Sequence, residues 1–334
     1  MQETGATTIR PSVAIRHRLV GIIAPLVDIL LLPLVLPAGL VLKFVRRYGL
    51  ERLGACRALL TRIGIIPVRR HYYDPFVSAA DLRQPLNQER FLPGIEWNVP
   101  AQLEFLESLN YGHEFAELLA TNDSFMFRLK NGAFESGDAE FLYQLIRLKK
   151  PKRVYEIGSG QSTLIVRGAI RKNAAESGVQ CRHLCIEPFE APWLEAAGVA
   201  TLRKRVEEVD LALFAELEEN DLLFIDSSHV IRPQGDVVTE YLSILPTLRP
   251  GVIVHVHDIF SPRDYLEEWV LKVRLLWNEQ YLLEAFLTQN PEWKILAAVN
   301  LLKHRHFDQL RRVCPYLSAD REPGSFYIQR INPR

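Results

Sequence analysis

The chain has 334 residues, of which 48% are hydrophobic, 24% charged and 10% aromatic; this composition is typical of a globular protein and excludes a disordered, collagen-like or coiled-coil chain. Forty basic residues balance forty acidic ones, so no overall positive charge is available to hold a nucleic acid, and none is expected as a partner. The four cysteines make neither a disulfide framework nor, since Cys181 and Cys185 stand without a second pair, a zinc site.

Residues 19–42 form an apolar stretch that contains one charge, Asp28, and is long enough to span a bilayer. Proline removes a helical hydrogen bond, and three prolines lie inside the stretch: Pro25, Pro33 and Pro37. Basic residues mark the cytoplasmic side of a membrane segment. They lie on both sides here, as Arg10, Arg16 and Arg18 before it and a longer run from Lys43 to Arg70 after it. These flanks fit a proline-broken hairpin or a kinked single span; a buried helical pair is the remaining alternative.

Residues 50–66 place apolar side chains at helical spacing among arginines, as in a helix that rests on anionic lipid, although a solvated helix is an alternative. We therefore expect residues 1–70 to be a membrane-associated helical or hairpin region that contacts lipid through residues 19–66, with the C-terminal domain in the cytoplasm. Residues 71–130 are expected to form a helical linker or lid. Its helical core positions are Leu103, Leu106, Leu109 and Phe115.

From residue 131 to the end, short apolar runs alternate with helical patterns. Asp138 is expected to cap a helix that continues to Leu148. The expected strands are Arg153–Ile157, Leu184–Glu187, Val199–Leu202, Leu222–Asp226, Val252–His257, Lys294–Val299 and Ser325–Arg330. Such alternation predicts an α/β fold, with a doubly wound and mostly parallel sheet covered by helices on both faces.

In such sheets, ligands bind beyond the carboxyl ends of the strands. Gly158 and Gly160 follow the first strand at once and allow a tight turn into the next helix. The dinucleotide-binding motif G-x-G-x-x-G requires a third glycine at the position where this chain has Thr163, which disfavours a nicotinamide cofactor. Glu187 ends the second strand, where a carboxylate can accept hydrogen bonds from ribose hydroxyls.

The segment from Val154 to Gly160 resembles the first motif of class I S-adenosylmethionine-dependent methyltransferases, and the ends of the fourth and fifth strands resemble the branch that methylates hydroxyls of small molecules and sugars. The resemblance implies a seven-stranded sheet whose last strand is antiparallel. It also implies a cofactor site. The residues implied in binding S-adenosylmethionine are Glu156 near its amino group, Gly158, Ser159 and Gly160 around its methionine part, Glu187 at its ribose, and Asp226.

Methyl transfer needs an aligned acceptor that is made nucleophilic by a base or a metal. The candidate catalytic residues are Asp226, His229, His257 and Asp258, of which Asp226 and Asp258 match positions where some relatives bind Mg²⁺. His255 alternates with valines inside its strand and is expected to pack in the core. The segment from Trp277 to Tyr281 could face the acceptor, but helix-start chemistry and core packing explain it as well.

The sequence thus predicts a membrane-associated methyltransferase that acts on a hydroxyl of a small molecule, a glycan or a lipid-linked precursor. Two alternatives remain: a nicotinamide-dependent oxidoreductase, and a membrane-tethered nucleotide-binding scaffold without turnover.

Overall fold

The computed structural model describes residues 11–120 and 125–332, and only the backbone of residues 11–22. Arg10 of the predicted basic flank lies outside the described residues. The chain falls into two compact units, residues 1–78 and residues 79–334. The division into a membrane region, a lid and a catalytic domain stays a prediction.

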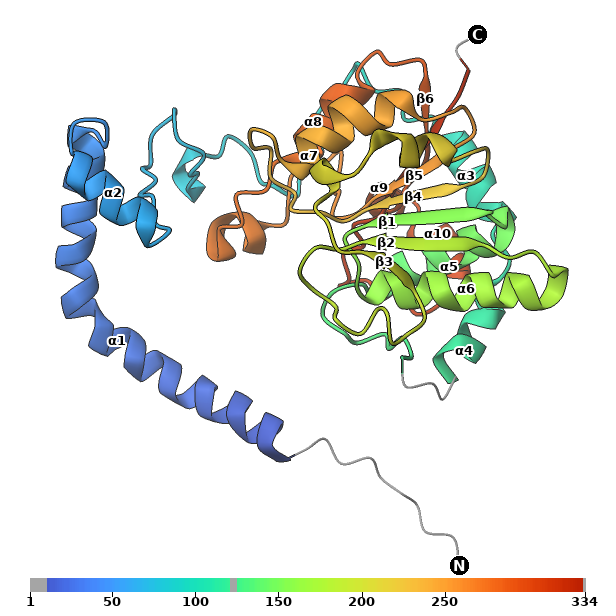
Figure 1. The fold of residues 1–334 in the computed structure, drawn as a ribbon, viewed down its shortest axis with the longest axis horizontal. Coiled ribbons are helices and arrows are strands. Elements are labelled where there is room, and N and C mark those ends of the chain that lie inside the picture. Colours follow the sequence, from blue (N-terminus) through green and yellow to red (C-terminus); the bar gives the residue numbers. More distant parts are fainter. Residues whose placement is uncertain (1–10, 121–124, 333–334) are drawn as a thin grey trace, which may run out of the picture. The chain divides into compact units, whose positions relative to one another are not determined.

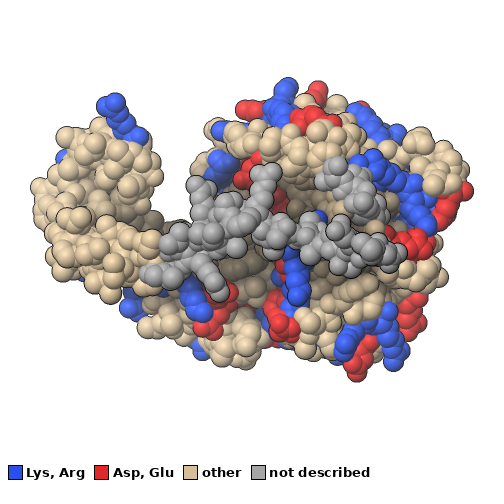
Figure 2. All heavy atoms as spheres, turned by 90° about the horizontal axis from the view of Figure 1, so that it is seen from below, with Lys and Arg blue, Asp and Glu red and all other residues tan. Residues whose placement is uncertain are grey.

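The first unit contains one long helix, α1 (Pro11–Tyr48), and the three prolines lie inside it. The hairpin alternative is therefore wrong: each proline removes one hydrogen bond, and the apolar residues between them continue the helix, which bends (Figure 1). An 18-residue window within Ile23–Tyr48 has a mean hydropathy of 2.3 and contains no buried residue, which also excludes the buried helical pair. In the described chain this is the one helix long and apolar enough to cross a membrane, by length and composition. In Figure 2 the surface of this first unit, at the left of the view, is largely uncharged.

A second helix, α2 (Gly54–Arg62), is shorter than the predicted 50–66. Gly49 ends α1 with a φ of +109°, a backbone conformation that favours glycine. Asp74 then accepts hydrogen bonds from the side chains of Arg46 (2.7 Å) and Arg69 (3.0 Å). These ion pairs tie the end of the first unit to the C-terminal turn of α1.

The second unit is built on one seven-stranded sheet in the order β3-β2-β1-β4-β5-β7-β6. All pairs are parallel except those of β7, which runs antiparallel to β5 and β6, as predicted. The strands are β1 (Arg153–Ile157), β2 (Arg182–Ile186), β3 (Ala200–Leu202), β4 (Leu222–Ile225), β5 (Ile253–Val256), β6 (Trp293–Ala298) and β7 (Phe326–Arg330). All seven predicted strands are present; the bounds of β1 are those predicted, and the ends of the other strands differ by at most two residues.

Helices cover both sides of the sheet, with α5 and α6 on one side and α7 and α8 on the other (Figure 1). The α-helices are α3 (Val99–Ser108), α4 (Gly112–Ala120), α5 (Asp138–Lys149), α6 (Gln161–Ser177), α7 (Asp236–Thr239), α8 (Glu279–Leu287), α9 (Val299–Arg305) and α10 (Phe307–Val313). The short 3₁₀ helices are η1 (Ala79–Asp81), η2 (Val206–Glu208), η3 (Leu211–Glu216) and η5 (Leu245–Thr247), and the π-helical segments are η4 (Glu240–Ile244) and η6 (Glu268–Val273).

The core lies between the sheet and these helices. Strands β4 and β5 are buried at every position, which explains why they are apolar, apart from His255, instead of alternating between apolar and polar residues. Leu106, Leu109 and Phe115 are buried as predicted, and Leu103 packs against the core. The capping prediction for Asp138 is wrong: Gly137 is the cap residue, and the carboxylate of Glu140 accepts a hydrogen bond from its N–H (2.8 Å).

Candidate active site

The site lies where the strand order reverses, between β1 and β4, which is the usual place for a ligand in a doubly wound sheet. Gly158 follows β1 with a φ of +78°. A Cβ atom on Gly158 would overlap the backbone carbonyl oxygen of Asp226, the residue that follows β4. Glycine is therefore required for the first loop to pass close to the end of the neighbouring strand.

A cavity of about 620 Å³ opens at this edge of the sheet, a volume that suits a nucleoside-sized ligand. The predicted site residues that line it are Gly158, Ser159, Gly160, Glu187, Asp226, His257 and Asp258. Four separate stretches of sequence thus converge on one cavity. Arg205, Val206, Glu207 and the exposed ring of Phe189 line it as well. His229 lies behind the lining, with only 4% of its surface exposed.

Glu187 uses one carboxylate oxygen to shape its own loop. Oε1 accepts hydrogen bonds from the backbone N–H groups of Phe189 (2.9 Å) and Glu190 (2.8 Å). Within the described chain, no hydrogen bond engages Oε2. One oxygen of this buried, cavity-lining carboxylate therefore remains to accept from a ligand.

Glu156 does not join the other predicted cofactor residues around the cavity. Its fully buried carboxylate accepts from the hydroxyls of Ser162 and Thr163 (3.1 Å each) and pairs with His183 on β2. Cys185 completes this cluster, 3.6 Å from Glu156. The carboxylate of Glu156 therefore does not line the cavity; it holds the start of α6. Its predicted place near the amino group of the cofactor stays a prediction.

The four predicted catalytic residues meet at the ends of β4 and β5. Nε2 of His229 lies 3.2 Å from Asp226 Oδ1 and 3.6 Å from Asp258 Oδ2. Nδ1 of His257 lies 3.6 Å from Asp226 Oδ1 and 3.5 Å from Asp258 Oδ1. His229 and Asp258 both have positive φ values, +59° and +57°, as residues at functional sites often do.

The cluster alternates positive and negative groups. Burial alone would lower the pKa of His229 and His257, but the neighbouring carboxylates outweigh it and raise the pKa of both imidazoles well above the usual value. Burial alone would raise the pKa of Asp226, but the two imidazoles hold it below its usual range. Burial raises the pKa of Asp258, and the Asp226 charge adds to this effect. The two acids are therefore unequal, which suits a site that handles a proton.

His255 and His257 have different surroundings although both are buried. The ring of His255 stacks on Tyr327 with 4.3 Å between centroids, and burial lowers its pKa well below the usual value. This agrees with the prediction that His255 packs in the core. Both ring nitrogens of His257 lack a hydrogen-bond partner in the described chain, and its Nε2 lies 3.9 Å from Asp138 Oδ2, which also lacks one. Such buried polar groups are costly unless a ligand or water satisfies them.

Comparison with known proteins agrees with this geometry. Residues 155–259 match the family model described as a methyltransferase domain, and the segment contains the glycine loop, Glu187 and the ends of β4 and β5. Residues 155–259 form a methyltransferase domain.

Three further similarities concern this methyltransferase domain. An uncharacterized protein of Archaeoglobus fulgidus is 27% identical over 164 residues, which are 45% of this chain and 73% of that protein. An O-methyltransferase from Bacillus cereus, solved in complex with SAH, is 14% identical with a TM-score of 0.37, covering 71% of this chain and 98% of that one. The O-methyltransferase TomG from Streptomyces achromogenes, involved in tomaymycin synthesis and solved with SAM, is 16% identical with a TM-score of 0.37, covering 69% and 90%.

The structure adds residues to the candidate site that sequence reasoning missed. Glu279, at the start of α8, contacts Nδ1 of His229 at 2.8 Å, and Tyr241 donates a hydrogen bond to the same carboxylate (3.1 Å). The ring of Trp277 lies 4.3 Å from that of His229. The one feature of the sequence that could have indicated these residues is the polar start of the helix at Trp277–Tyr281, but the sequence does not show which part of the fold this segment contacts.

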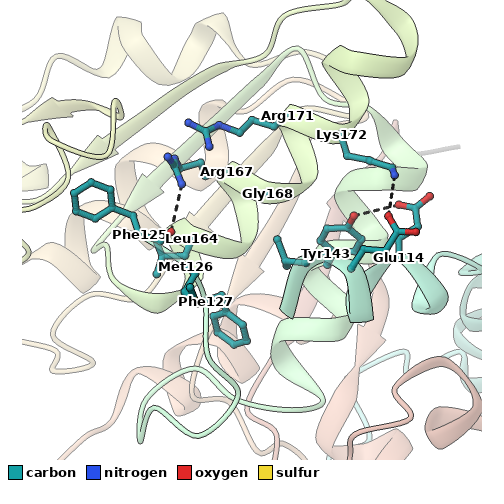
Figure 3. A pocket seen from close by; sticks show the side chains of 12 residues that line it. Glu114, Phe125, Met126, Phe127, Tyr143, Leu164, Arg167, Gly168, Arg171 and Lys172 are labelled. Atoms are coloured by element: carbon teal, nitrogen blue, oxygen red, sulfur yellow. Dashed lines mark hydrogen bonds and ion pairs between the residues drawn. The ribbon is translucent and has the colours of Figure 1, made fainter. Parts of the chain in front are cut away.

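A second cavity, of about 300 Å³, lies beside α6 and contains none of the predicted site residues. Figure 3 shows Arg167 donating to the backbone oxygen of Phe125, and Lys172 near the acids of α4. Lys172 pairs with Glu117 (3.1 Å), and Tyr143 donates to Glu114 (3.1 Å). These contacts join α4, α5 and α6, so the cavity belongs to the packing of the domain.

Proposed function

We propose that this protein methylates a hydroxyl group of a small molecule, a glycan or a lipid-linked precursor, with S-adenosylmethionine as the donor, at a membrane to which α1 attaches it. The observation that carries the proposal is the convergence of the glycine loop, Glu187, Asp226 and Asp258 on one cavity at the point where the strand order reverses.

The cavity offers a place for each part of the donor. The loop Gly158–Gly160 and the N-terminus of α6 suit the methionine part, because backbone N–H groups there bind a carboxylate. Oε2 of Glu187 suits the ribose hydroxyls. Phe189, with Arg205 stacked over its ring at 5.6 Å, suits the adenine.

When bound, S-adenosylmethionine supplies an activated methyl group on a sulfonium. The chain must align the acceptor hydroxyl and take its proton. The donor would supply its methyl group to the acceptor oxygen, and a basic side chain of the site would take the proton of the acceptor. The sequence-based candidates are His229 and His257, which both face Asp226 and Asp258. Each imidazole can take this proton only in its neutral form, and the raised pKa of both rings favours the protonated form.

The acids at the strand ends also fit a divalent cation. Ligand atoms of Asp226, His229 and Asp258 lie within 4.8 Å of one another, and the orphaned nitrogens of His257 add an unsatisfied donor set nearby. Asp226 and Asp258 would hold the ion, and it would stabilise the alkoxide of the acceptor. Carboxylate oxygens suit Mg²⁺.

The nicotinamide alternative is disfavoured by Thr163, which occupies the third-glycine position. Its hydroxyl accepts a hydrogen bond from Gly160 N (3.2 Å) and donates to Glu156.

The decisive experiment titrates the full-length chain, in detergent, with S-adenosylmethionine and with NAD⁺ by calorimetry. We expect binding of S-adenosylmethionine alone. Methyl transfer to a cell-envelope extract that stops in Asp226→Asn would exclude the scaffold; NAD⁺ binding without S-adenosylmethionine binding would refute the proposal.

The membrane part of the proposal rests on α1. Its segment Ile23–Tyr48 is exposed, long enough to span a bilayer, and followed by arginines that favour a cytoplasmic C-terminal side. After α1, the exposed Ile63, Ile65 and Ile66 lie among arginines, as in a segment that rests on anionic lipid. Carbonate-washed membranes should retain the full chain and lose a variant without residues 1–48. Release of both into the wash would contradict insertion.

A further inference from the structure

A short loop of the first unit, residues 69–74, is joined by Asp74 to the C-terminal turn of α1; we call it the tied loop. The carboxylate of Asp74 accepts hydrogen bonds from the side chain of Arg46 (2.7 Å) and from the backbone N–H (3.1 Å) and side chain (3.0 Å) of Arg69. Asp74 N donates to the carbonyl oxygen of His71 (2.8 Å), which closes the loop. The hydrogen bond from Arg69, with that from Arg46, lowers the pKa of Asp74 to about 2, so the carboxylate is charged at neutral pH.

Three aromatic rings of the tied loop pack on one another at the surface. The ring centroids of Tyr72 and Tyr73 are 4.0 Å apart, and that of His71 lies 4.7 Å and 5.2 Å from them. Tyr72 is 81% exposed and Tyr73 is 76% exposed. A tyrosine combines an apolar ring with a polar hydroxyl, and tyrosines are therefore enriched where a bilayer meets water. The stacked rings thus expose a surface that suits this boundary.

The length of α1 places the tied loop at the same boundary. The apolar stretch ends at Leu42, and Arg46 is four residues further along α1, a rise of about 6 Å. The headgroup layer on each side of the hydrocarbon core is roughly 5–8 Å thick. When the end of the stretch lies at the edge of the core, Arg46 lies in the headgroup layer. Asp74 lies there with it, because the two side chains are in contact, and Tyr72 and Tyr73 directly precede Asp74.

The charge of the chain between α1 and the tied loop is positive. Residues 43–74 contain two acids, Glu51 and Asp74. They contain eight basic residues: Lys43, Arg46, Arg47, Arg52, Arg57, Arg62, Arg69 and Arg70. Anionic headgroups attract such a basic segment next to a membrane helix. A bilayer therefore fits the tied loop through its charge as well as through its rings.

We propose that the tied loop binds the headgroup layer of the bilayer that α1 enters, with Tyr72 and Tyr73 as the contacts and Asp74 as the residue that sets their depth. The inference rests on the membrane part of the proposed function. It goes beyond that part because it assigns the place where the chain leaves the lipid. Residues 71–74 then belong with the membrane region and not with the linker that the sequence predicts from residue 71.

Fluorescence quenching tests the depth of the tied loop. All five tryptophans lie in the second unit, so Tyr72→Trp adds the first one to residues 1–78. The full-length variant is placed in nanodiscs of equal amounts of phosphatidylcholine and phosphatidylglycerol, with a nitroxide either on the headgroup or near the end of the acyl chain, and the wild-type signal is subtracted. We expect the headgroup nitroxide to remove most of the added fluorescence and the acyl nitroxide to remove little. Tyr73→Trp repeats the measurement at the neighbouring ring.

Leu30→Trp is the depth control. Leu30 lies in the middle of the apolar stretch and is 67% exposed, so the acyl nitroxide should quench it more than the headgroup nitroxide. Asp74→Ala, made in the Tyr72→Trp variant, removes the acceptor of both arginines, and the preference for the headgroup nitroxide should be lost. Glu51→Ala is its matched control, because this exposed carboxylate pairs with Arg52 (3.7 Å) in the same unit, and the preference should stay.

The outcomes separate the two proposals. If the acyl nitroxide does not quench Leu30→Trp, α1 lies outside the lipid, and the membrane part of the proposed function fails together with the inference. If it does, and the headgroup nitroxide fails to quench Tyr72→Trp and Tyr73→Trp, α1 inserts while the tied loop lies outside the headgroup layer, which overturns the inference alone. A headgroup preference that persists in Asp74→Ala overturns the role of Asp74.

Discussion

The Cα of Gly158 faces the backbone carbonyl of Asp226 so closely that the position has no room for a side chain. Asp226 N in turn donates to the carbonyl of Ile157, the last residue of β1 (2.9 Å). The glycine loop and the end of β4 are therefore joined by backbone packing, and this contact sets the distance between the expected methionine end of the donor and the acidic cluster.

Gly158→Ala tests this contact. The variant combines a left-handed φ of +78° with a clash against backbone, which cannot move aside cheaply. We expect a loss of about 2–4 kcal/mol of folding free energy, as for other strained special positions, and no measurable binding of S-adenosylmethionine. Thermal unfolding with and without the donor measures both effects.

Gly160→Ala is the matched control. Its φ of −176° is extended backbone that any residue adopts, and no atom lies within 4 Å of a built Cβ. The melting temperature should stay at the wild-type value, while donor affinity falls if the methionine part passes there. Equal melting temperatures for the Gly158 variant and the wild type would contradict the packing argument.

Arg147 supports a second prediction, on stability. Its guanidinium is 1% exposed and forms ion pairs with Glu114 of α4 (2.6 Å) and Glu176 of α6 (2.7 Å). Arg147→Met leaves the buried Glu114 without its charged partner, with only the hydroxyl of Tyr143 still donating to it, and the loss costs about 3–5 kcal/mol. We expect a clear drop in melting temperature. Lys172→Met, which breaks the exposed pair with Glu117 on the same two helices, should leave it nearly unchanged; equal effects would show that burial does not decide the outcome.

The sequence predicted the sheet because its strands are short, mainly apolar runs that are followed by functional residues. Leu222–Ile225 is entirely apolar, and Val154–Ile157 is apolar apart from Glu156, so the ends of both strands could be located from the sequence. Since parallel strands end at one edge, the convergence of Gly158, Glu187 and Asp226 followed from the topology.

The direction in which individual side chains point could not be predicted from the sequence. Glu156 precedes Gly158 by two residues, but its side chain points toward His183 of the neighbouring strand, a cross-strand contact that motif position does not encode. Glu279 was missed for a similar reason, because only the packing of α8 brings it to His229. The prolines of α1 also misled, since a single missing hydrogen bond bends a helix without ending it.

A third prediction concerns Glu187. Glu187→Gln can keep the acceptor for the N–H groups of Phe189 and Glu190, while its amide nitrogen replaces the oxygen left for the ribose. Losing a hydrogen bond to a charged group costs about 1.5–3 kcal/mol, so we expect the Kd for S-adenosylmethionine to rise about 10- to 100-fold. Glu190→Gln removes a neighbouring exposed charge and is the control in the calorimetric titration. An equal loss in both variants would indicate general electrostatics instead of a ribose contact.

The last prediction uses Glu140, on the first turn of α5. Burial raises the pKa of Glu140 to about 7, and hydrogen bonds from the backbone N–H groups of Gly137 and Tyr316 offset only part of this effect. The folded state therefore holds a proton that the unfolded state, with a pKa near 4.5, releases. The contribution of this group to stability is fully present below pH 4.5 and is lost as the pH rises to about 7.

Glu140→Gln removes this titration and keeps the shape of the side chain. The amide disturbs one of the two backbone contacts at every pH, so the absolute stability of the variant is not the test. Between pH 5 and pH 8, the difference in unfolding free energy should shift by about 2–3 kcal/mol in favour of the variant, because one pKa unit corresponds to about 1.4 kcal/mol. Urea titrations of both proteins at the two pH values measure the shift, and all other titrating groups cancel in the difference. Parallel pH profiles would show that Glu140 is charged in the folded protein, and that its two backbone donors compensate for its burial.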